Sequence, residues 1–254
     1  MSLARRIVSE GLGTAFLLAV VVGSGIMAER LAGGNVAVAL LANAIATGAG
    51  LVALILMFGT ISGAHFNPVV TLSEAWQKNM PRSEVLPYLA VQLAGAFAGV
   101  AAAHLMFDVP VFIASEHVRS GPAQWWSEFV ATFGLIAVII GCSRSRPGVT
   151  PFAVAAYITA AYWFTASTSF ANPAVTLARS ATNTFAGIRP FDAPGFIAAQ
   201  LLGAAAATLL FCWLYPAPPA DATVAGTVAP SDFAPSGKPE RDMPAPTRPG
   251  SSHG

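Results

Sequence analysis

Charged residues are scarce in this sequence. Asp, Glu, Lys and Arg make up only 10% of its 254 residues, whereas soluble domains usually carry about 25%. A soluble globular class is therefore disfavoured. The formal net charge is +1 and no basic patch stands out, so we predict no nucleic-acid partner.

Cysteine is almost absent, and so are the residue sets that catalysis needs. Cys142 and Cys212 lie near the ends of different apolar runs and form no CxxC pair, so we predict neither a disulfide nor a metal site. The sequence shows no Ser/His/Asp set, no metal cluster and no nucleotide-binding loop. We therefore predict that the protein is not an enzyme and needs no cofactor.

Long apolar runs are what the sequence has instead. Hydrophobic residues make up 55% of the chain, and a helix needs about 20 of them to cross a hydrocarbon core of about 30 Å. The first run follows Arg5 and Arg6, as a signal peptide would, but it is too long for a typical signal core and no cleavage site ends it cleanly. We predict six membrane spans. Their bounds are roughly Ile7–Met27, Val36–Phe58, Val85–Phe107, Trp125–Cys142, Pro151–Ser167 and Ala193–Tyr215.

The distribution of Lys and Arg predicts which side of the membrane each end occupies, because cytoplasmic loops carry an excess of these residues. With the N-terminus inside, only Arg30, Arg119, Arg179 and Arg189 fall outside. We therefore predict a multi-pass protein of the cell (inner or plasma) membrane with both termini in the cytoplasm. The inner group is Arg5, Arg6, Lys78, Arg82, Arg144, Arg146, Lys238, Arg241 and Arg248.

Residues 216–254 differ from the rest. They are rich in Pro, Ala, Ser and Thr and have no hydrophobic period, which predicts a disordered cytoplasmic tail. The tail is either a solvated end or a docking segment.

The rest of the chain, residues 1–215, contains an internal duplication. Three motifs recur in the same order, in halves of about 5–108 and 122–215. Since each half holds three spans, the halves must be inverted relative to each other, as in inverted-repeat transport proteins. The matching positions are Glu10, Thr14, Asn67, Pro68, Tyr88, Gln92 and Gly95 in the first half and Glu128, Thr132, Asn172, Pro173, Phe196, Gln200 and Gly203 in the second.

The repeated Asn-Pro segments are too short to cross a membrane. Asn67–Gln77 and Asn172–Thr182 are about ten residues long, which gives helices of about 15 Å. Asn suits the N-cap, and Pro suits the first helical position. Two such half-helices would meet, N-terminus to N-terminus, near the midplane. Non-helical backbone is tolerated at that depth only inside protein or beside water, so we predict a pore or cavity.

The chemistry of such a pore follows from its backbone. Each half-helix places about half a positive elementary charge at the midplane, which opposes cations and protons. Asn67 and Asn172 offer N–H donors, and the carbonyls of residues 63–66 and 168–171 offer acceptors. This arrangement suits small neutral solutes and requires no catalytic group.

Four features of the sequence resemble those of the major intrinsic proteins, the aquaporins and aquaglyceroporins. They are the paired Asn-Pro motifs, the SGAHFNP run, the Glu near the start of the first and fourth spans, and the AxQxxG of the third and sixth spans. The resemblance covers roughly residues 8–215. It implies an all-α membrane protein with a right-handed bundle of six helices plus two re-entrant half-helices. It also implies a homotetramer in the lipid bilayer, with one pore per subunit and passive flux of small neutral solutes.

The sequence departs from the family pattern at both motifs. The first is Asn67-Pro68-Val69 rather than NPA, a small steric change. The second, Asn172-Pro173-Ala174, is followed by Val175, where most of the family has an arginine that lines the outer filter. Arg179 is the nearest arginine, and it is either a substitute filter residue or a residue with a surface or packing role.

The family's spacing gives the filter as Thr47, Ala160, Ser169 and Val175, unless Tyr162, Trp163 or Phe164 replaces Ala160. This wide, uncharged filter resembles a bacterial branch whose genes accompany arsenic resistance. The resemblance predicts passage of arsenite as As(OH)3, with methylated arsenicals, glycerol or water beside it. The alternatives are a water-selective or glycerol-selective channel and a proton-coupled transporter.

Ionisable groups inside spans are costly and need partners. The family implies that Glu10 and Glu128 accept hydrogen bonds from the loops before the half-helices, with Gln92 and Gln200 as ties between helices; the alternative is a proton relay. His65 is expected to line the pore, either as a plain wall or as a pH gate.

Overall fold

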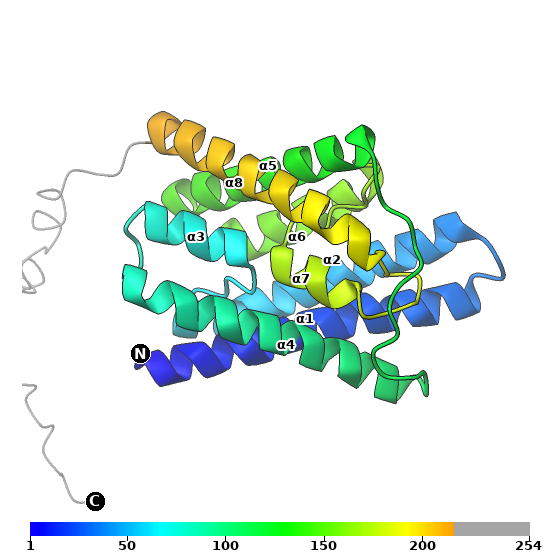
Figure 1. Cartoon of the computed structure of the whole chain (residues 1–254). Coiled ribbons are helices and arrows are strands. Elements are labelled where there is room, and N and C mark those ends of the chain that lie inside the picture. The colour runs from blue at the N-terminus through cyan, green and yellow to red at the C-terminus, as the bar shows by residue number, and fades with distance from the viewer. Residues whose placement is uncertain (216–254) are drawn as a thin grey trace, which may run out of the picture. The chain divides into compact units, whose positions relative to one another are not determined.

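The computed structural model describes residues 1–215, and the predicted tail, residues 216–254, lies outside the described residues. Within residues 1–215 every regular element is a helix, which confirms the predicted all-α class (Figure 1). The α-helices are α1 (Leu3–Leu31), α2 (Val36–Ser62), α3 (Pro68–Trp76), α4 (Val85–Met106), α5 (Pro122–Ser145), α6 (Thr150–Phe164), α7 (Pro173–Arg179) and α8 (Ala193–Leu214). Short 3-10 turns η1 (Arg82–Glu84), η2 (Pro147–Val149) and η3 (Pro190–Asp192) precede α4, α6 and α8.

Helices α1, α2, α4, α5 and α8 are long and apolar enough to cross a membrane. The fifth predicted span, Pro151–Ser167, is shorter than expected, because α6 has 15 residues and ends at Phe164. Thr165 has an extended backbone, and the amide of Ala166 donates to Ser127 Oγ near the start of α5. The last three residues of the predicted span therefore belong to the loop that leads into α7.

The short helices α3 and α7 begin at the Asn-Pro motifs and contain 9 and 7 residues. Figure 1 shows both lying among the longer helices. They run toward opposite ends of the bundle. Arg144 near the end of α5 donates to Gln77 Oε1 just after α3 (2.7 Å), whereas Glu116 N, before α5, donates to Asn183 Oδ1 after α7 (3.1 Å). The two halves are therefore inverted.

Matching glycines bring the long helices together. Helix α4 packs on α1 and α8 packs on α5. A Cβ at Gly95 would overlap the carbonyl oxygen of Gly11, and one at Gly203 would overlap that of Phe129. Such close backbone approach is typical of helix packing in membranes. Large apolar side chains such as Leu86 and Trp213 remain exposed on the outside of the bundle, as a surface that faces lipid requires.

Candidate channel and its lining

A cavity of about 260 Å³ lies inside the bundle and is lined by α1, α2, α3, α5, α6 and α7 together with the loops before the half-helices. Asn67 and Asn172 both line it. At the end of the bundle that holds the N-terminus its wall includes His65, and at the opposite end it includes Arg179. The cavity therefore passes the point where the two half-helices meet.

The two asparagines hold this meeting point together. Asn67 Oδ1 accepts from Val69 N (3.1 Å), and Asn172 Oδ1 accepts from Ala174 N (3.0 Å) and Val175 N (3.2 Å). Each side chain therefore caps its own helix, as the Asn-Pro pattern predicts. Each amide also crosses to the other half: Asn67 Nδ2 donates to Ala171 O and Asn172 Nδ2 to Phe66 O, both at 2.8 Å. The second N–H of each amide remains for a solute.

The loop before α3 is fixed by Glu10, which is fully buried. Its Oε1 accepts from Ser62 Oγ (2.7 Å) and His65 N (2.9 Å), and its Oε2 accepts from Phe66 N (2.7 Å) and Gln92 Nε2 (2.9 Å). Phe66 has a φ of 49°, a left-handed conformation that is costly for a bulky side chain. The carboxylate stabilises this conformation, in which the Phe66 carbonyl accepts from Asn172 Nδ2.

The second half repeats the arrangement around Glu128, which is also fully buried. Its carboxylate accepts from Phe170 N (2.8 Å), Ala171 N (2.9 Å) and Gln200 Nε2 (2.6 Å). Ala171 has a φ of 48°, nearly that of Phe66 at the matching position. Both carboxylates are thus occupied by donors from the loops and from a glutamine, which are the contacts that the loop-holding role requires.

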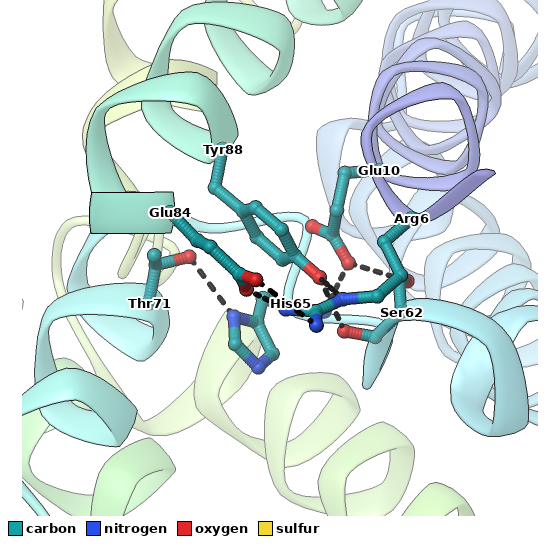
Figure 2. Close-up of polar contacts among 7 residues, drawn as sticks. All are labelled: Arg6, Glu10, Ser62, His65, Thr71, Glu84 and Tyr88. Carbon is teal, nitrogen blue, oxygen red and sulfur yellow. Dashed lines mark hydrogen bonds and ion pairs between the residues drawn. The ribbon is translucent and has the colours of Figure 1, made fainter. Parts of the chain in front are cut away.

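The mouth nearest the N-terminus is polar (Figure 2). His65 lines the cavity, and its Nδ1 lies 3.0 Å from Thr71 Oγ1. The Tyr88 hydroxyl donates to Ser62 O (3.0 Å) and accepts from Arg6 Nε (2.9 Å), and Arg6 also forms an ion pair with Glu84. Helices α1 and α4 are therefore tied beside the loop that carries His65.

The opposite mouth contains three of the four predicted filter residues: Thr47, Ser169 and Val175 all line the cavity. Thr47 Oγ1 lies 3.2 Å from the hydroxyl of Tyr162, which lines it too. Ser169 is 3% exposed, and its Oγ is without a hydrogen-bond partner in the described part of the chain. The hydroxyls of Thr47 and Tyr162 therefore border the passage here, whereas the Ser169 hydroxyl is enclosed by protein.

The prediction that Ala160 contributes to the filter is wrong. Ala160 is exposed and does not line the cavity. The inner face of α6 is formed by Val154, Ile158 and Tyr162, which are spaced four residues apart and lie on one side of a helix. Ala160 falls midway between the last two and points away. The sequence signal for the inward face of α6 was the four-residue spacing of Val154, Ile158 and Tyr162, and it identifies Tyr162 as the residue that faces the cavity.

Arg179 is 2% exposed and lines the cavity, so it has no role at the membrane surface. Its Nε donates to Ala186 O, and its guanidinium carbon lies 3.4 Å from the centre of the Phe170 ring.

The Phe170 ring also faces a second arginine, Arg119, whose guanidinium carbon lies 5.2 Å from the ring centre. Burial lowers the pKa of Arg119, an effect that Glu128 partly offsets. Sequence reasoning missed Arg119, which lies in a loop without any recognisable pattern.

An inverted bundle with two opposed half-helices and a cavity that passes through their junction defines a membrane-embedded channel. A family model described as major intrinsic protein matches residues 1–158. The chain is 58% identical over 212 residues to aquaglyceroporin AqpS of Rhizobium meliloti (strain 1021), covering 84% of this chain and 91% of that protein. The chain belongs to the major intrinsic protein family, whose members are channels for small neutral solutes rather than enzymes.

Two more distant relatives agree with this assignment. Aquaporin NIP1-1 of Arabidopsis thaliana is 32% identical over 57% of this chain and 51% of its own length. Among solved structures, the aquaglyceroporin from Plasmodium falciparum superposes with a TM-score of 0.62 at 20% identity, covering 84% of this chain and 96% of that one. At that identity the likeness shows the shared fold.

Proposed function

We propose that this chain conducts small uncharged polar solutes passively, with arsenite as As(OH)3 the main substrate and glycerol and water also passing. The observation that carries this proposal is Val175. It lines the cavity from the first turn of α7, where most of the family places an arginine. A short apolar side chain leaves room for solutes wider than water, including methylated arsenicals. The similarity to an aquaglyceroporin supports the same substrate class.

The central junction supports neutral rather than charged solutes. The N-terminal ends of α3 and α7 meet where Asn67 and Asn172 bond across to each other's loops. Each helix end contributes about half a positive elementary charge at this point, so a cation or a proton is repelled. The amide donors and loop carbonyls replace the hydration of a neutral solute.

The proposal also covers the membrane orientation of the chain, its oligomeric state and the role of the residues that hold the loops. Both termini lie in the cytoplasm of the cell, since Arg5, Arg6, Arg82, Arg144 and Arg146 belong to the end of the bundle that holds the N-terminus. The subunits form homotetramers in the lipid bilayer, each with its own pore. Glu10 and Glu128 hold the loops, with Gln92 and Gln200 as ties between helices, and do not form a proton relay, because donors from the loops and from the glutamines occupy both carboxylates.

Stopped-flow light scattering on proteoliposomes tests the proposal with water, glycerol and arsenite. The parent channel should conduct arsenite at a rate that rises linearly with concentration and ignores the proton gradient. Val175→Arg should lose arsenite and methylated arsenicals by roughly tenfold or more, about 1.4 kcal/mol of added barrier, and keep much of the water flux. Val175→Ala is the matched control and should retain both. Equal arsenite flux in Val175→Arg would refute the role of Val175, and saturating, proton-coupled flux would indicate a transporter.

A further inference from the structure

Two residues outside the family's filter positions border the mouth opposite the N-terminus. Tyr162 is 3% exposed and Arg179 is 2% exposed, and both line the cavity. Both supply polar groups to this mouth, whereas the side chains at the predicted positions, Ala160 and Val175, are apolar. Thr47, whose hydroxyl lies 3.2 Å from that of Tyr162, supplies a third polar group there.

We propose that Arg179 and Tyr162 form the solute-selective site of this channel, and that the site recognises small neutral molecules with several hydroxyl groups. This inference rests on the proposed function, since it assumes that such solutes pass. It assigns their recognition to residues displaced from the filter positions of the family.

The free donors of Arg179 carry the argument. Only its Nε has a protein hydrogen bond among residues 1–215, to Ala186 O. The described ion pairs do not include Arg179 either, and its guanidinium lies against the face of the Phe170 ring. The four N–H donors on the Nη nitrogens make no hydrogen bond within residues 1–215. The Nη atoms are also not enclosed by protein, so they reach the open cavity. Hydroxyl oxygens of a solute are suitable acceptors.

The facing hydroxyls supply the complementary half of the site. Thr47 and Tyr162 share one hydrogen bond, 3.2 Å long, so one proton and several lone pairs of the pair remain for a solute. A hydroxyl group both donates and accepts. A solute with several hydroxyls can therefore bond to Arg179 and to these oxygens at once.

The test compares glycerol with 1,2-propanediol, which has a similar width and one hydroxyl fewer, in proteoliposomes corrected for empty vesicles. Tyr162→Phe removes a single oxygen and should lower the glycerol-to-propanediol permeability ratio roughly fivefold. Arg179→Met should lower it further, roughly tenfold or more, and Arg179→Lys less than Met. A wider or narrower pore would change both permeabilities together and leave their ratio unchanged.

Matched controls lie outside the site. Tyr157→Phe changes the same helix, but Tyr157 does not line the cavity and its hydroxyl donates to Val130 O. Arg30→Lys changes another arginine that lies over an aromatic ring, that of Phe107 at 5.3 Å, but Arg30 is exposed and does not line the cavity. Both controls should keep the parent ratio. If Arg179→Met does not fold, Tyr162→Phe decides alone, because its fold is least disturbed.

The outcomes separate this inference from the proposed function. Ratios within twofold of the parent in Tyr162→Phe and in the folded Arg179 variants overturn the inference, as does an equal fall in Tyr157→Phe. In either case, a parent that conducts glycerol and arsenite leaves the proposed function standing. A parent that conducts water but neither of these solutes overturns both.

Discussion

The two halves of the molecule agree at the centre and differ at the mouths. Around each half-helix the same parts recur: a buried glutamate, two loop amides, a glutamine and a threonine. Farther out, Tyr88 in the first half binds Arg6 and Ser62, whereas its counterpart Phe196 packs against Phe170 at 5.2 Å. The shared parts hold the loops in shape. The parts that differ give one mouth a histidine and an ion pair, and the other two arginines on an aromatic ring.

The largest effect is expected from the shared carboxylates. Glu10→Gln and Glu128→Gln replace an acceptor by an amide whose N–H groups face the loop donors. Each should lower the free energy of unfolding by roughly 3 kcal/mol, because hydrogen bonds to a buried charge are lost. Glu10 accepts four bonds and Glu128 three, so the first variant should be the less stable. Thermal unfolding in detergent measures this, with exposed Glu29→Gln on the same helix as Glu10 as the control. Wild-type stability in either variant would contradict the loop-holding role.

Exchanging the aromatic residues that differ between the halves tests whether the mouths are specialised. Phe196→Tyr places a hydroxyl in a fully buried site beside Phe170 and should cost roughly 2 kcal/mol. Tyr88→Phe removes the bonds to Ser62 and Arg6 and should cost roughly 1 kcal/mol. Denaturation of the two variants under the same conditions compares the costs. If both exchanges were neutral, the aromatic difference between the halves would have no structural meaning.

The central asparagines should respond alike in both halves. Asn67→Ala and Asn172→Ala each remove a helix cap and one crossing bond, and should cost roughly 2 kcal/mol and lower water flux. Asn35→Ala is the matched control: the Asn35 side chain accepts from the amides two and three residues on, as that of Asn172 does, but it is exposed and makes no crossing bond, so its cost should stay near 1 kcal/mol. A cost for Asn172→Ala no larger than that for Asn35→Ala would show that the crossing bonds add nothing.

The half-helices were predicted to within three residues because their signals are local. Asn accepts from amides two or three residues away, and Pro suits the first helical position, so neither depends on the rest of the chain. The long spans follow from composition, since the membrane demands about 20 apolar residues. The inverted repeat then fixed how the two halves are related.

The choice between Ala160 and Tyr162 could not be made by counting residues. Counting back from Asn172 passes through a loop in which Thr168, Ser169 and Ala171 all have positive φ. Such a loop does not continue the regular rotation of a helix, so the number of residues between Asn172 and α6 does not say which side of α6 faces inward. The contact of Arg119 with Phe170 joins a long loop to a distant segment, and no local pattern encodes it.

The smallest effect is expected from the ion pair between Arg6 and Glu84 at the first mouth. The side chains of Arg6 and Glu84 are 23% and 16% exposed, so water and salt screen their attraction. In a double-mutant cycle with Arg6→Gln and Glu84→Gln, the coupling should be below about 1 kcal/mol and fall as salt is raised. Thermal unfolding at low and high salt measures it, with Tyr88→Phe as a background that removes the other bond of Arg6. A coupling of several kcal/mol that ignores salt would mean that the pair is shielded from water, and that the first mouth is fixed as rigidly as the centre.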